Sequence, residues 1–330
     1  MRIIFMGTPD FAVPALNALC ESGQDVILAV TQPDRQKGRG RKVIQTPVSV
    51  CAQKWGVPVF QPVRIREPEA IARIRDLSPD LIVVAAFGQI LPQELLDIPR
   101  LGCVNIHASL LPRLRGAAPI QWAVINGDAQ SGITLMQMDA GLDTGDILFQ
   151  ESLPIEPGET GESLYEKLAA LGGDMIVRCL PAIEAGEISP VPQDDGQSTY
   201  APMLRKEMGE IDWSMPAEQI ERRLRGMTPW PGAFTRFEGH VLKIWRAEAA
   251  DAVDAGGSGP ADSSAEPSQG EGAVPGTVLS TDKKSIYVAT GEGALRLLEV
   301  QAEGKKRMDT GAFLRGTRIS DGTVLGEEKH

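Results

Sequence analysis

The side chains with the clearest potential for chemistry lie at residues 105–112, which read Asn-Ile-His-Ala-Ser-Leu-Leu-Pro. His107 is one of three histidines in the 330-residue chain, and Asn105 precedes it by two positions. In a β-strand this spacing places both side chains on one face, roughly 6.5 to 7 Å apart along the chain. A carboxamide donor beside a titratable imidazole suits a reaction in which negative charge develops on a carbonyl oxygen. A buried Asn and His that only satisfy a loop are the alternative.

A second group of polar side chains lies in the segment 139–146, Asp-Ala-Gly-Leu-Asp-Thr-Gly-Asp. It resembles a cation-binding loop but lacks the regular ligand spacing and the closing Glu of an EF-hand. A turn between two strands is the plain interpretation. The functional alternative places one carboxylate against His107, to orient the ring and raise its basicity. The sequence alone does not choose among Asp139, Asp143 and Asp146.

The elements that position these residues alternate between strands and helices. Apolar runs at 3–6, 26–31 and 81–87 are typical of parallel strands covered on both faces, and 103–107 is a further strand. Helical patterns at 12–22, 48–55 and 68–77 separate them. The alternation predicts a Rossmann-like, doubly wound and mainly parallel α/β sheet. The turn at Pro112 ends the strand at 103–107, so the Asn105/His107 pair is expected at the carboxyl end of a strand, where such sheets bind ligands.

The remaining pattern divides the chain into two domains. A helix at 118–126, two strands within 132–149 and a helix at 160–184, with a break at Gly172-Gly173, complete a catalytic domain of residues 1–189. Residues 190–205 are predicted to be a linker, because the segment 188–202 is rich in Pro, Asp and Gln and has no periodicity. A helix near 217–225 and about five short strands then predict a small β-barrel of the oligonucleotide-binding (OB-like) type at 206–330, or a sandwich fragment. The polar stretch 249–272 is predicted to be a disordered insert.

Composition narrows the class of protein. The chain has no uninterrupted apolar stretch of membrane length and no signal-peptide pattern, so no membrane partner is expected. Its four scattered cysteines have no metal-ligand spacing, which predicts reduced thiols in a cytoplasmic protein. With three histidines and no HExxH, no metal is expected. The turn after the first strand has Gly7 as its only glycine, which argues against a dinucleotide site.

The net charge of −11 hides an uneven distribution. Residues 248–272 carry six acids and no base, so the rest of the chain is near −5. Residues 34–42 carry five bases against one acid, a local charge of +4. This glycine-broken basic segment fits either a solvated surface loop or a flexible arm that grips phosphate. Together with the further basic clusters at 222–225 and 305–307, it favours polyanion binding more than any one cluster would alone.

Taken together, residues 105–121 and 139–146 resemble the folate-dependent formyltransferases. The match extends through residues 2–16, 31–42, 113–121, 211–213, 228–231 and 304–306, and so over nearly the whole chain it is similar to the methionyl-tRNA formyltransferases. The resemblance implies transfer of a formyl group from 10-formyltetrahydrofolate to the amino group of methionine on initiator tRNA. By matching, Asn105, His107 and Asp143 are the catalytic residues. Two departures stand out: Leu114 replaces a frequent aromatic residue, and the acidic insert lies outside the shared pattern.

The resemblance also implies binding sites and partners. A pterin slot for the folate donor is expected to be lined by residues from two turns: Phe87, Gly88, Ile90, Leu91, Ser109, Leu110, Leu111 and Pro112. The initiator methionyl-tRNA is expected to contact basic residues of both domains: Arg35, Lys37, Arg39, Arg41, Lys42, Lys305 and Lys306. A monomer that needs no metal is expected.

Other functions share part of this pattern. A formyltransferase for a small-molecule amine, such as a sugar nucleotide or glycinamide ribonucleotide, would use the same three residues but would not need the basic segment or the second domain. A folate deformylase would replace the amine with water. A non-catalytic tRNA-binding protein with a decayed enzyme domain is disfavoured by the intact Asn105, His107 and Asp143.

Overall fold

The computed structural model describes residues 1–37, 42–251 and 273–326, without the side chains of residues 36, 37 and 42. The chain divides into two units. The first consists of Met1–Ile120, Ala129–Ile155 and Ser163–Pro202, and the second of Gln121–Asp128, Glu156–Glu162 and Met203–His330. Most of the segment predicted to link two domains is therefore packed in the first unit.

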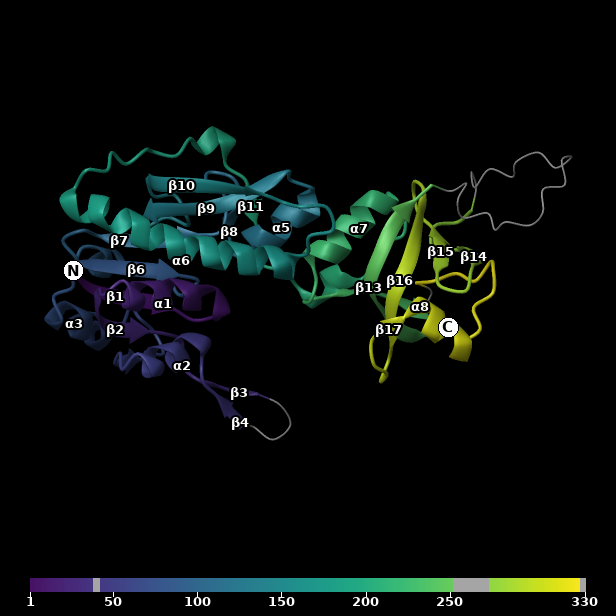
Figure 1. The fold of residues 1–330 in the computed structure, drawn as a ribbon, viewed down its shortest axis with the longest axis horizontal. Helices are drawn as coiled ribbons and strands as arrows, with labels where there is room; N and C mark the ends of the chain where they lie inside the picture. Colours follow the sequence, from purple (N-terminus) through teal and green to yellow (C-terminus); the bar gives the residue numbers. More distant parts are fainter. Residues whose placement is uncertain (38–41, 252–272, 327–330) are drawn as a thin grey trace, which may run out of the picture. The chain divides into compact units, whose positions relative to one another are not determined.

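The first unit is built on a seven-stranded sheet with the order β10-β9-β7-β6-β1-β2-β5 (Figure 1). Neighbouring strands from β5 to β7 run parallel to each other. Strand β9 runs antiparallel to both of its neighbours, β7 and β10. This mainly parallel, Rossmann-like sheet confirms the predicted fold class. Its strands are β1 (Arg2–Gly7), β2 (Asp25–Val30), β5 (Val59–Phe60), β6 (Leu81–Ala85), β7 (Cys103–His107), β9 (Gln130–Gln137) and β10 (Ile147–Pro154).

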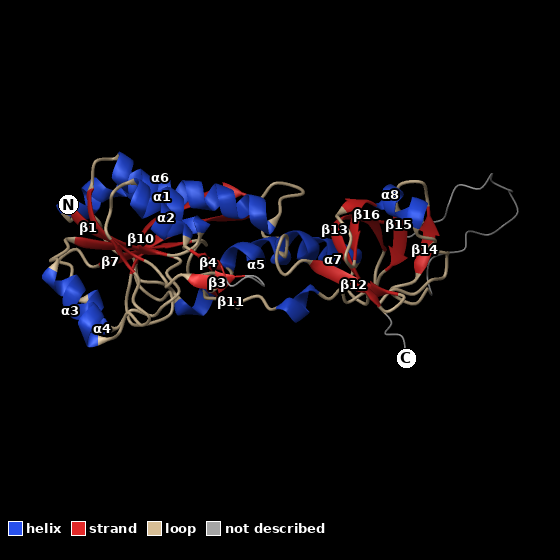
Figure 2. Cartoon of the chain, turned by 90° about the horizontal axis from the view of Figure 1, so that it is seen from below, coloured by secondary structure: helices blue, strands red, loops and turns tan. Residues whose placement is uncertain are grey.

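Helices cover both faces of this sheet, with α1, α2 and α6 on one side and α3 and α4 on the other (Figure 2). The central strands are apolar at successive positions because both faces are buried. Ile4 and Met6 of β1 pack in a core with Ile74 and Leu95 of the α3/α4 layer, whereas Ile3 and Phe5 face the opposite layer. These helices are α1 (Val13–Glu21), α2 (Pro47–Lys54), α3 (Pro68–Asp76), α4 (Gln93–Leu96) and α6 (Gly161–Ala185), with a short 3-10 turn at Asp10–Ala12. A further helix, α5 (Pro119–Asn126), belongs mostly to the second unit.

The predicted break at Gly172-Gly173 is wrong, because α6 runs through both glycines. A Cβ atom on Gly172 would lie 2.7 Å from Cγ2 of Ile106, and one on Gly173 would lie 2.9 Å from the backbone of Pro14. The two glycines therefore allow α6 to approach β7 and α1 closely, rather than interrupting the helix. No helix within the described parts of the chain is both long and apolar enough to cross a membrane.

Two short pairs of strands lie outside the main sheet. The ends of the basic segment, predicted as a loop, pair as the antiparallel hairpin β3 (Arg35–Lys37) and β4 (Lys42–Ile44). Backbone hydrogen bonds between the two strands do not depend on side-chain type, so the charged residues of β3 and β4 can pair despite their poor strand propensity. The second pair is parallel, between β8 (Arg115–Gly116) and β11 (Tyr200–Ala201).

The second unit is an antiparallel sheet in the order β12-β13-β16-β15-β14, with β17 paired to β16. This agrees with the β-rich second domain that the sequence predicts. Apolar side chains of α7, including Ile220 and Leu224, pack on its core with Trp213, whose indole Nε1 donates to Thr235 Oγ1 at 3.1 Å. The elements are α7 (Ala217–Gly226), β12 (Ala233–Phe237), β13 (His240–Ala250), β14 (Val278–Thr281), β15 (Ile286–Ala289), β16 (Ala294–Ala302), β17 (Met308–Asp309) and α8 (Thr310–Gly316).

The acidic insert predicted at residues 249–272 begins too early, because Ala249 and Ala250 are the last residues of β13 and pair with Leu295 and Ala294 of β16. Its residues 252–272 lie outside the described residues, so its predicted disorder stays a prediction.

Candidate active site

Strand β7 presents Asn105 and His107 as predicted, near its carboxyl end. Asn105 pairs with Val84 of β6 and Met136 of β9, and His107 with Thr134 of β9. The His107 side chain is buried at 6% exposure, whereas Asn105 is partly exposed. No residue in the described part of the chain hydrogen-bonds the Asn105 carboxamide, so its donor is available to a ligand.

The two ring nitrogens of His107 face different groups. Nε2 lies 3.1 Å from the carbonyl oxygen of Leu114, and Nδ1 lies 3.6 Å from Oδ1 of Asp143. Because a carbonyl oxygen can only accept, this contact requires a proton on Nε2. Nδ1 is then the position at which a proton can come and go, and it faces a carboxylate. Such an arrangement can hold an imidazolium or pass a proton along the Nδ1 edge.

Of the three acids that the sequence left open, Asp143 is the one that faces His107. Its Oδ2 accepts a hydrogen bond from the Gly116 amide at 2.8 Å, which fixes the carboxylate. Asp139 instead accepts from the Gly141 amide and the Thr144 hydroxyl, within its own loop. Asp143 has φ +53° and Leu114 has φ +58°, so both residues touching His107 have left-handed backbone, which few side chains adopt without support.

Polar side chains of β9 and β10 hydrogen-bond to the main chain of the turn after β7. Thr134 Oγ1 donates to the Ser109 carbonyl at 2.6 Å and accepts from the Leu111 amide at 3.1 Å. Gln150 Nε2 donates to the Leu111 carbonyl at 3.0 Å. In this turn, which is expected to line the pterin slot, the Ser109 carbonyl and both main-chain groups of Leu111 therefore already have partners inside the protein. No pattern in the sequence identified Thr134 or Gln150, because their role depends on the antiparallel pairing of β9 and β10.

The other turn predicted to hold the folate, residues 87–91, is divided between the core and the surface. Phe87 and Leu91 are 2% and 3% exposed and belong to the hydrophobic core, whereas Ile90 is 81% exposed. The main chain of Phe87 is turned toward polar groups, because its carbonyl accepts from Thr8 Oγ1 at 3.0 Å and Gln32 Nε2 at 3.2 Å. Burial leaves Phe87 and Leu91 available to a ligand mainly through their backbone.

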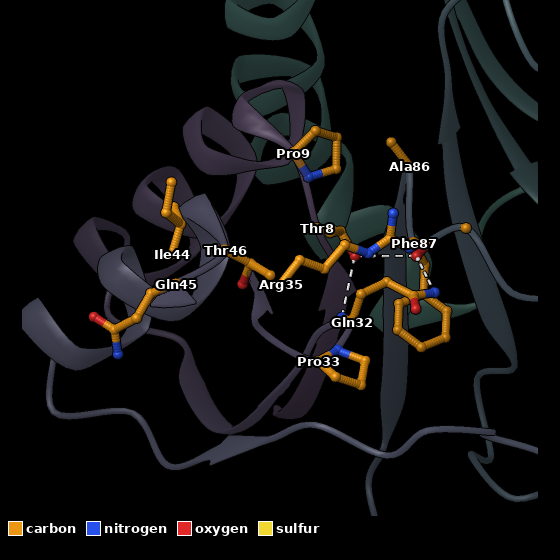
Figure 3. A pocket seen from close by; sticks show the side chains of 11 residues that line it. Thr8, Pro9, Gln32, Pro33, Arg35, Ile44, Gln45, Thr46, Ala86 and Phe87 are labelled. Atoms are coloured by element: carbon orange, nitrogen blue, oxygen red, sulfur yellow. Dashed lines mark hydrogen bonds between the residues drawn. The ribbon is translucent and has the colours of Figure 1, made fainter. Parts of the chain in front are cut away.

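A pocket of about 490 Å³ opens where the strand order reverses, between β1 and its neighbours β2 and β6 (Figure 3). Crevices at this position are the usual ligand sites of open α/β sheets. The walls come from the turns after these three strands and from the base of the β3/β4 hairpin: Thr8, Pro9, Gln32, Pro33, Arg35, Ile44, Gln45, Thr46, Ala86, Phe87 and Gly88. The pocket therefore includes Phe87 and Gly88 of the predicted folate site and Arg35 of the predicted tRNA site. Ser109–Pro112 do not line it.

The basic residues predicted to bind tRNA are only partly described. Arg35 lies on β3 and is exposed, and Lys37 and Lys42 are paired across the hairpin. Arg39 and Arg41 lie outside the described residues. Lys305 and Lys306 are exposed in the turn between β16 and β17. In the basic cluster at 222–225, Arg225 already has partners within the protein. It forms an ion pair with Glu221 and donates to the Glu159 carbonyl at 2.7 Å.

No group of three or more His, Cys, Asp or Glu side chains that could hold a metal ion is present among the described residues. Burial raises the pKa of the Cys103 thiol, on the same strand as Asn105 and His107, to about 12. It therefore stays protonated near neutral pH and is not a nucleophile.

Comparison with known proteins gives the family. Residues 1–180 match the formyl transferase family and residues 203–318 match the formyl transferase C-terminal domain. The chain is 50% identical over 326 residues to a methionyl-tRNA formyltransferase of Geobacter metallireducens, covering 99% of each chain. It is 49% identical over 325 residues to that of Agathobacter rectalis, covering 98% of this chain and 99% of the relative.

Solved structures with low sequence identity share the fold. A sugar 3N-formyl transferase, WlaRD, has a TM-score of 0.64 at 18% identity over 93% of this chain and 99% of its own. A methionyl-tRNA formyltransferase from Clostridium thermocellum has a TM-score of 0.52 at 20% identity, over 75% of this chain and 93% of its own. HypX from Aquifex aeolicus, solved with tetrahydrofolic acid, has a TM-score of 0.59 at 18% identity, and this chain spans 51% of its length. On its matched domains and its full-length relatives, the chain belongs to the methionyl-tRNA formyltransferase family.

Proposed function

We propose that the protein transfers the formyl group of 10-formyltetrahydrofolate to the free amino group of methionine on initiator methionyl-tRNA. The product, formylmethionyl-tRNA, serves translation initiation. The single observation that carries the formyl-transfer chemistry is the placement of His107 between the Leu114 carbonyl and the Asp143 carboxylate, on the same strand face as Asn105. The assignment of the acceptor is supported by the full-length methionyl-tRNA formyltransferase relatives. We expect the enzyme to act as a cytoplasmic monomer.

The reaction makes one C–N bond and breaks another. The methionine amine attacks the formyl carbon, and the carbonyl oxygen becomes an oxyanion. Asn105 donates to that oxygen and the His107 imidazolium stabilises its charge, and one such donor typically contributes about 3–4 kcal/mol. The tetrahedral carbon then releases the folate nitrogen.

Protons must move in both steps, because the attacking ammonium loses a proton and the departing folate nitrogen gains one. Asp143 and the Nδ1 edge of His107 are the groups that we assign to this transfer, directly or through water. The Nε2–H bond to Leu114 holds the ring while Nδ1 exchanges its proton. The route uses neither a covalent intermediate on the protein nor a metal ion.

The substrates are assigned to different parts of the protein. The folate is proposed to lie against Phe87–Leu91 and Ser109–Pro112, which flank the carboxyl ends of β6 and β7. The acceptor end of the tRNA is proposed to enter the pocket of Figure 3, because Arg35 and Ile44 of the basic hairpin form part of its wall. The second unit is proposed to bind tRNA through phosphates, with Lys305 and Lys306 among the contacts.

An acceptor comparison tests the proposal. The purified protein is incubated with 10-formyltetrahydrofolate and, separately, with initiator methionyl-tRNA, with methionine amide, with an amino-sugar nucleotide, or with no acceptor. Formylmethionine formed only with charged tRNA supports the proposal. Comparable turnover with a free small amine would favour the small-molecule alternative, and release of formate without any acceptor would identify a deformylase.

A further inference from the structure

Residues 191–201, which we call the strap, are hydrogen-bonded to the loop that carries Asp143 and to residues 114–116, which follow the turn after β7. Val191 exchanges two backbone hydrogen bonds with Ile147, at 2.8 and 2.9 Å. At the other end, Tyr200 and Ala201 pair with Arg115 and Gly116. The strap was predicted to be part of a linker because it has no periodicity, but its two ends are hydrogen-bonded to the first unit.

Within the strap, the Gln193 side chain connects the loop that carries Asp143 to Arg115 of β8. Gln193 Nε2 donates to the carbonyl oxygens of Asp143, at 2.9 Å, and Gly145, at 2.7 Å. Its Oε1 accepts from Nε and Nη2 of Arg115, at 3.0 and 2.8 Å. The carboxamide NH2 group of Gln193 thus donates twice to the Asp143 loop, and its oxygen accepts twice from Arg115 of β8. Arg115 is in turn paired with Asp195 of the strap at 2.8 Å.

The strap also holds the turn that contacts the other side of His107. The Thr199 hydroxyl accepts from the Leu114 amide at 2.8 Å, and the Thr199 carbonyl accepts from the Arg115 amide at 2.9 Å. Asp143 and Leu114 both have left-handed backbone, which is uncommon for a residue with a side chain and less favourable for leucine than for aspartate. The strap supplies a hydrogen bond to the main chain of each.

We propose that the strap sets the distance and orientation of His107 and Asp143, with Gln193 as the positioning residue. Among the described residues, no hydrogen bond joins the Gln193 side chain to the His107 ring or to the Asp143 carboxylate. It acts by fixing the Asp143 loop to β8, where Gly116 donates to the same carboxylate. The inference rests on the proposed roles of His107 and Asp143.

The chain contains a matched control for Gln193. Gln197 lies in the same strap and is exposed, and its Nε2 donates to Asp194 Oδ2 within a local turn. The variants Gln193→Ala and Gln197→Ala make the same chemical change four residues apart. Gln193→Glu adds an isosteric test, because it places a carboxylate oxygen against two carbonyl oxygens while keeping a partner for Arg115.

Two measurements on the full-length protein separate positioning from stability. The first is kcat and KM for initiator methionyl-tRNA and 10-formyltetrahydrofolate, with Tm recorded for each variant. The second is the nitrogen NMR spectrum of the imidazole rings. The chain has three histidines, so the His107 signals can be assigned by their loss in His107→Gln.

For Gln193→Ala and Gln193→Glu we expect kcat to fall by about tenfold or more and both KM values to stay within about twofold, because a small misplacement of reacting groups lowers turnover more than binding. The His107 ring signals should shift in both variants and not in Gln197→Ala. Unchanged kcat and ring signals in Gln193→Ala would overturn the proposal, and so would a lower Tm with normal turnover per folded molecule. If the wild-type protein formylated no methionyl-tRNA, the proposed function would fail, while the ring signals would still test the strap.

Discussion

The imidazole Nε2 of His107 lies 3.1 Å from the main-chain oxygen of Leu114, seven residues further along the chain. This acceptor cannot gain or lose a proton, so it fixes which ring nitrogen is protonated in the neutral side chain. Because the acceptor is a main-chain oxygen, the contact to His107 depends on the backbone conformation of residue 114 more than on its side chain. Leu114 therefore makes this contact to His107 through its main chain and not through its side chain.

Asp143→Asn is the most direct test of the charge that faces His107. The amide oxygen can still accept from Gly116, but the negative charge beside Nδ1 is lost. We expect kcat to fall by about 10²-fold or more with folding intact. Asp139→Asn makes the same change in the same loop, away from His107, and should leave kcat near that of the wild type. Equal losses in both variants would show that the loop, and not the Asp143 charge, matters.

Asn105→Asp tests the oxyanion donor without changing side-chain size. The substitution removes the NH2 group and places a negative charge where negative charge develops. A decrease in kcat of about 10²- to 10³-fold is expected, with little change in folate affinity. Asn17→Asp is a suitable control, because within the described parts of the chain the Asn17 side chain bonds through its oxygen alone, accepting from Trp55 Nε1 at 2.8 Å and from the Cys51 thiol. Single-turnover kinetics on both variants measure the chemical step directly.

Arg39→Ala tests the basic segment carried by the β3/β4 hairpin. Because contacts to phosphate release counterions, losing one should lower kcat/KM for charged tRNA and reduce its salt dependence by about one unit of log-log slope. Folate binding should be unaffected. Arg66→Ala, at an exposed arginine of the same unit, is the control. If Arg39→Ala and the wild type had the same kcat/KM for charged tRNA at every salt concentration, the basic segment would be a solvated surface loop without a role in tRNA binding.

The second unit offers a local comparison of two lysine pairs. Lys305 and Lys306 lie in the β16–β17 turn, and Lys283 and Lys284 lie between β14 and β15; all four are exposed. Replacing Lys305 and Lys306 with Glu should weaken tRNA binding by about tenfold or more at physiological salt, since two phosphate contacts would become repulsions. The same exchange at Lys283 and Lys284 should weaken it less. Filter binding with both double variants measures the difference, and equal effects would argue against a local site.

The raised pKa of Cys103 predicts how stability depends on alkaline pH. The free thiol has a pKa near 9, and burial raises that of Cys103 to about 12. Between these values the unfolded state loses the proton and the folded state keeps it, so stability present below pH 9 is lost as pH rises toward 12. The loss should be about 1.4 kcal/mol per pH unit for this thiol. Urea unfolding from pH 8 to 10.5 should show a shallower decline in Cys103→Ala, and parallel declines would contradict the prediction.

Much of the first unit could be predicted from the sequence because its signals are local. β7 begins and ends where its apolar and polar residues indicate, and the helix α3 follows a clear amphipathic pattern. The strap was missed because its order comes from hydrogen bonds to residues about 50 to 85 positions away, which leave no periodicity in the chain. The choice of Asp143 over its neighbours was open for the same reason. Only the folded loop decides which carboxylate faces the ring.

The close approach of α6 to β7 means that a substitution in α6 can lower activity without touching a catalytic residue. Ile106, between Asn105 and His107, has its Cγ2 atom where a side chain at Gly172 would begin. A residue larger than glycine at position 172 would require Ile106 or α6 to shift, and we expect that shift to disturb Asn105 and His107. A Gly172 variant should therefore resemble an active-site defect, although the helix contributes no group to the chemistry and the two sites are more than sixty residues apart in the sequence.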